Sequence, residues 1–411
     1  MLAAAAVVAL ALLAAYSLAS GRTLVALAVA LLPLAIWEAT RLTVALVLLG
    51  LSLPAFMSIF GEGASLNVAP SDVLLVVIVA AVAARMVITR SATELRALGP
   101  VAFPLAQYGL FLVFLLFAHV GRSEVLQTLQ RVELFLFPLI IGAFAALTGR
   151  HTHVLKAYVL SATVLAAVWP VADFGLQKNP VGGVIGNAIL LLVAYPPLRS
   201  YLPCLLVLVP GLLLTESRGA VGATAVGVLA FFLMRGYRRG ALMRRILPVA
   251  ALAAAAFFVL PQETTGRLTT FSAGKRTTGE YALFIRDQYR EDAYDVIDAH
   301  PWVGVGVGNY LAGDPSNLTL AKDPHNVILL QAAEGGYAFA GSFILLIGGA
   351  CLVLYSIRRV ELAPAAAAVM VATAAHGLVD VYWVRGTPVL SWLLLGMACA
   401  LVGRPARAAP P

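Results

Sequence analysis

Residues 73–82 read VLLVVIVAAV, a run in which every position is apolar, so that a helix formed from it would be apolar on all faces. A similar run extends from Leu24 to Ile36, and apolar segments of roughly 16 to 20 residues recur along the chain. That length is close to what an α-helix needs to cross the hydrocarbon of a membrane. Transmembrane β-barrels instead alternate apolar and polar residues within strands of about ten residues. The pattern therefore predicts an all-α polytopic membrane protein.

The composition of the whole chain points the same way. Of the 411 residues, 61% are hydrophobic and 12% are charged, whereas an average soluble domain has about 25% charged residues. A soluble surface needs far more charged residues than this chain supplies, so a water-soluble fold is excluded. The three cysteines lie inside apolar segments and provide neither a disulfide framework nor a cysteine-based zinc site: Cys204, Cys351 and Cys399.

The hydropathy of the chain predicts twelve to fourteen transmembrane helices with one sizeable hydrophilic loop between them. Residues 1–19 have no basic stretch ahead of their apolar run, so we expect a retained first span rather than a cleaved signal. The chain then divides into N-terminal spans at 1–260, a loop at 261–325 and C-terminal spans at 326–411. The candidate spans are 1–19, 22–37, 41–60, 71–89, 101–118, 131–148, 152–172, 182–198, 201–215, 219–234, 245–260, 326–357, 362–380 and 387–403.

Basic residues set the expected orientation, because cytoplasmic loops are enriched in Lys and Arg. Placing the most basic short loop in the cytoplasm also puts both termini there and the 261–325 loop on the outer side. The net charge of +8 is then partly topological and requires no nucleic-acid partner. The arginines of that short loop are Arg235, Arg238, Arg239, Arg244 and Arg245.

The long outer loop contains a stretch with helical periodicity. From Glu280 to Ala299, apolar residues recur at helical spacing and predict an amphipathic helix on the bundle or membrane surface. His300 and Pro301 end this helix, and the G-x-G-x-G segment from Gly304 to Gly308 follows as a tight connection. No strand precedes that segment and the chain has no Walker-type phosphate loop, so we reject a nucleotide site. Any energy must come from the substrate or from a gradient.

Metal-ligand patterns are weak in this sequence. His151 and His153 lie on the predicted cytoplasmic side, and the other histidines are scattered among outer segments. Asp292, Asp295 and Asp298 recur every three residues, which is typical of a solvated helix face rather than a metal cluster. We predict metal-independent chemistry without a cofactor.

Several arginines lie at the predicted outer interface: Arg122, Arg131, Arg218, Arg286, Arg290 and Arg385. Arg218 is the least typical of an interfacial anchor, because the turn Thr215-Glu216-Ser217-Arg218-Gly219 joins two apolar spans without a loop, near membrane depth. A salt bridge with Glu216 is the alternative. Arg286 and Arg290 are one helical turn apart and repel unless an anion lies between them. A phosphate suits guanidinium groups, although a solvated face explains the pair equally well.

His325 stands in Lys322-Asp323-Pro324-His325-Asn326, where the polar loop enters a long apolar span. A helix N-terminus disfavours imidazolium, so this histidine is suited to act as a general base, with a capping histidine as the alternative. Glu334 lies inside the same span, where an unpaired charge costs roughly 2.5 to 3.5 kcal/mol, and should be paired or protonated. His376 and Asp380 lie at the outer end of the penultimate span.

Together these segments resemble the O-antigen ligase and Wzy polymerase superfamily in order and spacing over residues 215–380. Ser217-Arg218-Gly219 resembles the family's S-R-G segment. Arg286 is followed by Pro301 and the Gly304-Val305-Gly306-Val307-Gly308-Asn309-Tyr310 stretch, as in the family. His325-Asn326 with Leu329, Glu334 and Gly336 is similar to its "HN..L......E.G" signature, and His376 to Asp380 resembles its "H...D". At position 290 the family often has an aromatic residue, which puts a family role for Arg290 in doubt.

The resemblance implies a GT-C-like glycosyltransferase on the periplasmic face of the bacterial inner membrane. Its donor would be an undecaprenyl diphosphate-linked glycan and its acceptor the lipid A core, with inversion at the anomeric centre. By similarity, Arg218 and Arg286 would bind the diphosphate, His325 would be the base and Asp380 a supporting residue. Further candidates for a supporting role are Arg290, His376 and Glu334.

Two other functions compete with a ligase. A polymerase would use the same donor, but its acceptor would be another lipid-linked repeat. We prefer the ligase because the chain has one sizeable outer loop rather than two large arginine-rich ones. A transporter for an anionic solute could also use these arginines. Against it, the polar motifs cluster at the outer interface, and the sequence has no inverted repeat or matching pair of broken helices.

Overall fold

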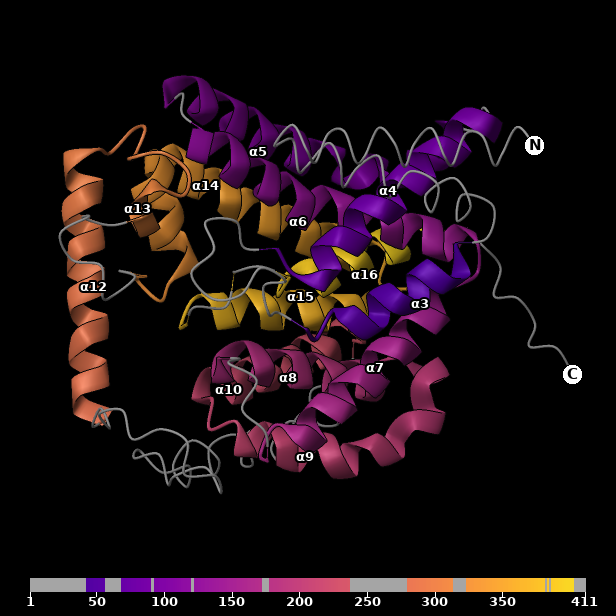
Figure 1. The fold of residues 1–411 in the computed structure, drawn as a ribbon. Helices are drawn as coiled ribbons and strands as arrows, with labels where there is room; N and C mark the ends of the chain where they lie inside the picture. Colours follow the sequence, from indigo (N-terminus) through magenta and orange to yellow (C-terminus); the bar gives the residue numbers. More distant parts are fainter. Residues whose placement is uncertain are drawn as a thin grey trace, which may run out of the picture.

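The computed structural model describes residues 42–55, 68–89, 92–119, 122–171, 177–236, 279–312, 323–380, 383 and 386–402. In these ranges the regular structure is entirely helical, without a strand (Figure 1). Among the described residues, six helical stretches are long and apolar enough to cross a membrane: Pro70–Val87, Leu95–Ala118, Gln127–Leu147, His151–Val168, Pro196–Leu214 and Val327–Ser356. The all-helical class is confirmed. The span count and the GT-C-like fold stay predictions, since the expected spans 1–19, 22–37 and 245–260 lie outside the described residues.

The helices follow the apolar runs of the sequence closely. The amphipathic helix expected from Glu280 to Ala299 is α12, and the span expected at 326–357 is α14. The elements are α3 (Thr43–Ser52), α4 (Pro70–Thr89), η1 (Ala92–Leu98), α5 (Gly99–Ala118), α6 (Arg122–Leu147), α7 (His151–Val168), α8 (Lys178–Ala194), η2 (Pro196–Cys204), α9 (Leu205–Leu214), α10 (Arg218–Met234), α12 (Gly279–Ala299), α13 (Asn309–Ala312), α14 (Val327–Ser356), α15 (Ala363–Gly377) and α16 (Val389–Ala400).

Two of the differences from the expected bounds have a clear physical reason. The helix α6 begins at Arg122 instead of residue 131, because its first two turns are polar and hydropathy detects only the apolar part. The span expected at 201–215 is a 3₁₀ helix, η2, followed by α9. Prolines lack the N–H that an α-helix needs beyond its first turn, and η2 contains Pro203 in addition to two prolines at its start.

Small residues let the central helices approach closely. A Cβ atom on Gly142 of α6 would meet the backbone of Leu393 in α16, and one on Gly396 of α16 would meet the backbone of Leu139 in α6. Gly227 of α10 lies in the same way against α15. Close backbone approach at small residues is how helices associate where lipid removes the hydrophobic driving force.

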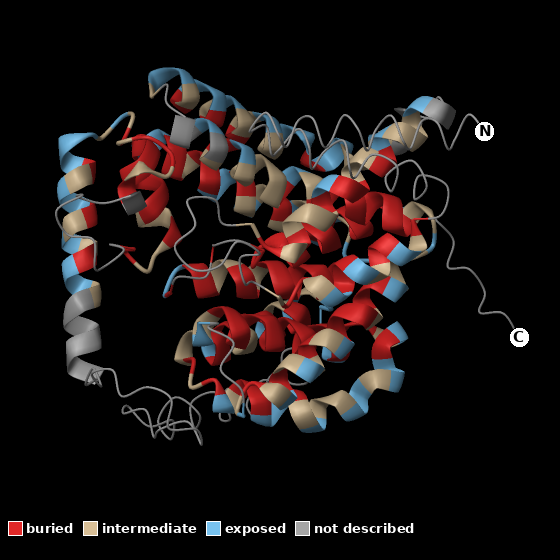
Figure 2. Ribbon diagram, viewed as in Figure 1, coloured by how far each residue is buried: buried red, intermediate tan, exposed pale blue. Residues whose placement is uncertain are grey.

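Burial follows this arrangement. The helices α8, α15 and α16 are mostly buried, whereas the surrounding helices carry exposed apolar side chains (Figure 2). Phe103, Leu206 and Leu352 are among the most exposed of these side chains. An apolar exterior around a tightly packed centre suits a protein whose outer surface faces lipid.

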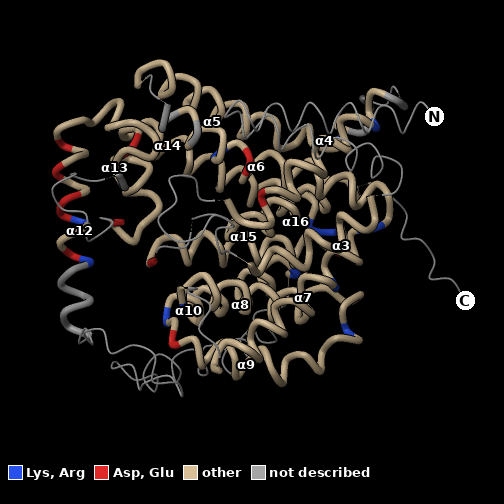
Figure 3. The backbone as a smooth tube through the Cα atoms, in the orientation of Figure 1, with Lys and Arg blue, Asp and Glu red and all other residues tan. Residues whose placement is uncertain are grey.

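The amphipathic helix α12 stands at one edge of the bundle, beside α13 and α14 (Figure 1). Its Ala293 and Ile297 are buried in a small apolar cluster that includes Leu330 and Ala333 of α14, and Tyr289 on the same helix is also buried. Acidic and basic residues are concentrated on α12 and at helix ends (Figure 3). The prediction of an amphipathic helix is therefore confirmed, with the apolar side of α12 packed on the bundle.

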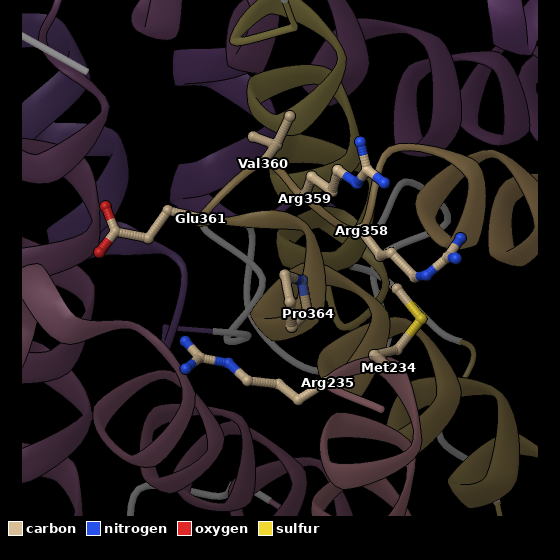
Figure 4. A pocket seen from close by; sticks show the side chains of 7 residues that line it. All are labelled: Met234, Arg235, Arg358, Arg359, Val360, Glu361 and Pro364. Atoms are coloured by element: carbon tan, nitrogen blue, oxygen red, sulfur yellow. The ribbon is translucent and has the colours of Figure 1, made fainter. Parts of the chain in front are cut away.

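The helices α10 and α14 run antiparallel to α15, so the described bundle has two distinct ends. At the end where α10 and α14 begin, Gly219 lies against His376, and Gly377 lies against Val327. We call this the site end. At the opposite end, a pocket of about 390 Å³ is lined by Met234, Arg235, Arg358, Arg359, Val360, Glu361 and Pro364 (Figure 4). The other arginines of the loop that we predict to be cytoplasmic, at 238, 239, 244 and 245, lie outside the described residues.

Candidate active site

The turn before α10 is as sharp as its sequence predicts. Glu216 has a left-handed backbone with φ of 53°, and the Ser217 side chain caps α10 by accepting a hydrogen bond of 3.2 Å from the Ala220 N–H. The Thr215 hydroxyl donates to the Leu212 carbonyl at 2.7 Å and accepts from the Ser217 N–H at 3.3 Å. Arg218 is consequently the first residue of α10, at the site end, without an intervening loop.

His376 and Asp380 lie directly beside this turn. A Cβ atom added to Gly219 would lie 3.2 Å from Nε2 of His376, so the buried imidazole packs on the glycine that follows Arg218. The Asp380 N–H donates to the His376 carbonyl at 3.1 Å. Two motifs that are more than 150 residues apart in the sequence are therefore adjacent in space.

Of the two arginines on α12, Arg286 faces this region. Its Nη2 lies 3.7 Å from Oδ2 of Asp380, with the two side chains 33% and 4% exposed. Arg290 instead pairs with Asp287 of its own helix at 3.4 Å, where both side chains are well exposed. The structure thus joins Arg286 to the late "H...D" motif and gives Arg290 the surface pairing expected of a solvated face.

The backbone around His325 fixes the tautomer of its ring. Nδ1 lies 2.8 Å from the Asp323 carbonyl oxygen, and the His325 backbone N–H donates to Oδ1 of Asp323 at 2.8 Å. A carbonyl oxygen can only accept a hydrogen bond, so Nδ1 carries a proton. In the neutral ring Nε2 is then unprotonated and able to accept a proton, which is the form that a general base requires.

Two neighbours hold this ring in place. Tyr289 of α12 stacks on His325, with ring centroids 6.3 Å apart and an interplanar angle of 15°. The next residue, Asn326, caps α14 by accepting hydrogen bonds from the backbone N–H groups of Ile328 and Leu329. His325 therefore sits immediately before the helix start, and the capping role belongs to Asn326.

Asp323 connects His325 to the other motifs. Burial raises the pKa of its carboxyl group, and the nearby Asp380 carboxylate raises it further, while the His325 N–H acts in the opposite direction. The two carboxylates therefore share one neighbourhood, with Arg286 against Asp380. The arrangement combines a proton acceptor with a partly exposed guanidinium group, which suits displacement of an anionic leaving group.

Glu334 is paired, as its position inside a span requires. Its side chain is completely buried, and Oε2 accepts a hydrogen bond of 2.5 Å from Nη2 of Arg131 on α6. Its Oε1 accepts from the Gly308 N–H at 2.9 Å. Both carboxylate oxygens thus have partners within the protein, which is typical of a buried charge that supports structure.

The sequence did not single out three residues that take part in these contacts. Arg131 is one of several outer arginines in the sequence, Asp323 stands in the segment around His325, and Tyr289 lies within the expected amphipathic helix. The signal for Arg131 was present, since an intramembrane carboxylate needs a cation from another span. The described residues contain no group of three or more His, Cys, Asp or Glu side chains arranged to hold a metal ion; metal independence of the chemistry stays a prediction.

Residues 203–338 match the model of the O-antigen ligase family. The match covers Arg218, Arg286, His325 and Glu334 and ends before His376 and Asp380. No curated protein matches this chain. The resemblance predicted from the motifs is confirmed for this part of the chain.

Proposed function

We propose, from the match of residues 203–338 to the O-antigen ligase family, that the protein transfers a glycan from undecaprenyl diphosphate to a sugar hydroxyl of the lipid A core. The reaction would take place at the periplasmic face of the bacterial inner membrane, with both termini in the cytoplasm. The observation that carries the proposal is the 2.8 Å contact between Nδ1 of His325 and the Asp323 carbonyl oxygen, which leaves Nε2 of the neutral ring able to accept a proton. Asp323 is in turn influenced by the carboxylate of Asp380, which pairs with Arg286.

The proposed reaction is a single displacement. The oxygen of the acceptor hydroxyl attacks the anomeric carbon of the donor glycan and forms a new C–O bond. The bond between that carbon and the diphosphate oxygen breaks, and its electron pair leaves with undecaprenyl diphosphate. The hydroxyl proton passes to Nε2 of His325. One such displacement inverts the anomeric configuration and needs no nucleotide, metal or other cofactor.

His325 has the support that a base in this reaction requires. A general base must be in the correct protonation state and pointed correctly before the acceptor arrives, and such a group contributes about 100- to 10,000-fold to the rate. The Asp323 carbonyl fixes the Nδ1 proton and Tyr289 covers one ring face. Both contacts reduce the rotation of the imidazole, so Nε2 keeps its direction.

Arg286 and Arg218 are the proposed ligands of the diphosphate. A guanidinium group matches phosphate oxygens with two parallel hydrogen bonds, and it also stabilises the charge that develops on the leaving group. Arg286 is a third exposed and lies 3.7 Å from Asp380, so it can turn to a phosphate while Asp380 keeps it nearby. We assign Asp380 this supporting role, and His376 the role of packing against the turn that carries Arg218.

Lipopolysaccharide from a deletion strain separates the ligase from the polymerase. A ligase predicts a bare core together with long lipid-linked glycan, whereas a polymerase predicts a core that carries a single repeat. Core with one repeat would contradict our preference. An anion transporter predicts a third result, because purified protein would then join no glycan to core acceptor when supplied with both substrates.

Reconstituted transfer tests the mechanism itself. Purified protein in detergent would be incubated with undecaprenyl diphosphate-linked glycan and lipid A core, and the product followed on a gel. We expect transfer without a nucleotide and with a chelator present. Failure of the wild-type protein to form product under these conditions would overturn the proposed function.

A further inference from the structure

The helix α14 is broken at Gly336, which has φ of 75° and ψ of −179°, a backbone conformation open essentially to glycine alone. In a regular helix the N–H of Tyr337 would donate to the Ala333 carbonyl four residues earlier, and the break separates this pair. Such unpaired groups are costly within a membrane protein. Loop 301–308 pairs them instead, through Tyr337 N–H to the Pro301 carbonyl at 2.8 Å, Val305 N–H to the Ala333 carbonyl at 3.0 Å and Gly306 N–H to the Glu334 carbonyl at 2.9 Å.

The loop and the broken helix touch through their backbones. A Cβ atom on Gly304 would collide with the backbone of Glu334, and one on Gly336 would collide with the backbone of Pro301 and Trp302. Gly304 also has a left-handed φ of 58°. Glycine is required at both positions, because a side chain on either would separate the loop from the helix.

The Glu334 side chain links the loop and α14 to a third element, the helix α6. One carboxylate oxygen accepts from the Gly308 N–H at the far end of the loop, and the other is held by Arg131 of α6. The Arg131 side chain is 14% exposed and the Glu334 side chain 0%. His119, at the end of α5, contacts the same loop through Nε2, which lies 3.1 Å from the Val303 carbonyl oxygen.

One end of this loop is connected to the helix that carries Arg286, and the other end contacts the residue that stacks on His325. Pro301 follows α12, the helix that carries Arg286, within two residues of its last turn. Beyond the loop, the Tyr310 hydroxyl donates to the Tyr289 carbonyl at 3.3 Å, and Tyr289 stacks on His325. Anything that moves loop 301–308 relative to α14 would therefore move Arg286 relative to His325.

We propose that Arg131 is a positioning residue, which holds Glu334 and thereby fixes loop 301–308 and α12 in the register that places Arg286 opposite His325. The proposal rests on the proposed function, because Arg286 and His325 are assigned there as diphosphate ligand and base. Arg131 needs no contact with the substrate for this role. Small displacements of a positioned group are costly, since a misplacement of about 1 Å can reduce catalysis on the order of 100-fold.

Steady-state kinetics separate positioning from mere folding. In Arg131→Ala we expect the KM for the lipid-linked donor to rise at least about tenfold in the folded fraction, with partial recovery in Arg131→Lys, which keeps the charge. A purely structural role would lower the amount of active protein and leave KM unchanged. The control is Arg358→Ala at the opposite end of the bundle, where the guanidinium donates to the Tyr355 carbonyl of its own helix.

A double variant covers the case in which Arg131→Ala does not fold. Arg131→Met with Glu334→Gln removes both charges and keeps an amide oxygen for the Gly308 N–H, so no buried charge is left alone. We expect this variant to fold and still to show a raised donor KM. Wild-type KM and kcat in the folded double variant would overturn the proposal.

Hydrogen–deuterium exchange tests the same proposal without activity, so its outcome is independent of the proposed function. We expect the amides of Val305 and Gly306, which donate to α14, to exchange at least about tenfold faster in the double variant than in the wild type. Amides of α16 serve as the reference. Unchanged exchange at Val305 and Gly306 would contradict the proposal even if the wild-type protein proved to transfer no glycan.

Discussion

The two ends of the helices α10, α14 and α15 both carry arginines and carboxylates, but they use them differently. At the site end, Arg131 and Arg286 pair with carboxylates that lie far away in the sequence, with Arg131 and Glu334 separated by 203 positions. At the opposite end, Arg235 lies over the ring of Phe231 and Arg358 over the ring of Tyr355, four and three residues earlier in their own helices.

This difference distinguishes a functional site, which the fold assembles from distant segments, from arginines that anchor helix ends at the membrane interface. A charge that is held by a distant element requires the fold to bring the partners together, and a buried pair is costly unless it is well satisfied. Arg235 and Arg358 contact rings within their own segments, and the guanidinium groups of the pocket point in different directions around Pro364 (Figure 4). Such contacts fit arginines that hold helix ends at a membrane surface.

The largest expected effect is the loss of the base at the site end. For His325→Ala we expect transfer to fall by about 100- to 10,000-fold, because the acceptor proton then has no positioned group to receive it. The measurement is the initial rate of transfer by detergent-purified protein, with Arg358→Ala as the control. A rate within about twofold of the wild type would remove His325 from the mechanism.

Replacing Glu334 at the site end and Glu361 at the opposite end compares how much each carboxylate contributes to the stability of the protein. In Glu334→Ala the guanidinium of Arg131 loses its buried partner, and we expect a loss of about 3 to 5 kcal/mol in unfolding free energy. In the control Glu361→Ala, an exposed carboxylate at the opposite end, the change should stay within about 0.5 kcal/mol. Thermal unfolding of both variants in one detergent gives the comparison. Equal shifts would erase the distinction between the two ends.

Two glycines of the same helix test the break at the site end. For Gly336→Ala we expect a loss of about 1 to 3 kcal/mol from backbone strain, in addition to the collision with loop 301–308. Gly341→Ala is the matched control, because a Cβ atom there meets no neighbouring group within 4 Å. Its stability should be unchanged or slightly raised. Similar unfolding temperatures for the two variants would show that the break does not need glycine.

The smallest effect concerns the two arginines of α12. We expect Arg286→Ala to lower kcat/KM for the donor by about tenfold, the order of one charge-assisted hydrogen bond. Arg290→Ala should change it by less than about twofold, since Arg290 pairs with exposed Asp287. Donor titrations at saturating acceptor measure both. A larger effect for Arg290 than for Arg286 would reverse our assignment.

Much of the helical architecture could be predicted from apolar runs alone. The spans at 71–89, 219–234 and 326–357 agree with α4, α10 and α14 to within one residue at each end, because their residues are predominantly apolar. The break at Gly336 could not be predicted in this way, since apolar residues continue on both sides of it. Its cause is a loop that lies elsewhere in the sequence and pairs with the exposed backbone.

The site was predictable only in part for a related reason. The motifs around Arg218, Arg286 and His325 could be recognised by order and spacing. The sequence also required a partner for Glu334, but nothing local identified Arg131, which is 203 positions away. Likewise, the Asp323 carbonyl that fixes the His325 tautomer is a backbone group, and its direction depends on the fold.

Photo-crosslinking with a donor analogue tests most directly which end of the bundle binds the diphosphate. The analogue would carry a diazirine on the isoprene unit next to the diphosphate, and labelled peptides would be identified by mass spectrometry. We predict labelling at the start of α10, on α12, at the start of α14 or at the end of α15, and loss of the label with excess undecaprenyl diphosphate. Competed labelling of the pocket formed by Arg235, Arg358 and Pro364 would contradict the assignment of the site.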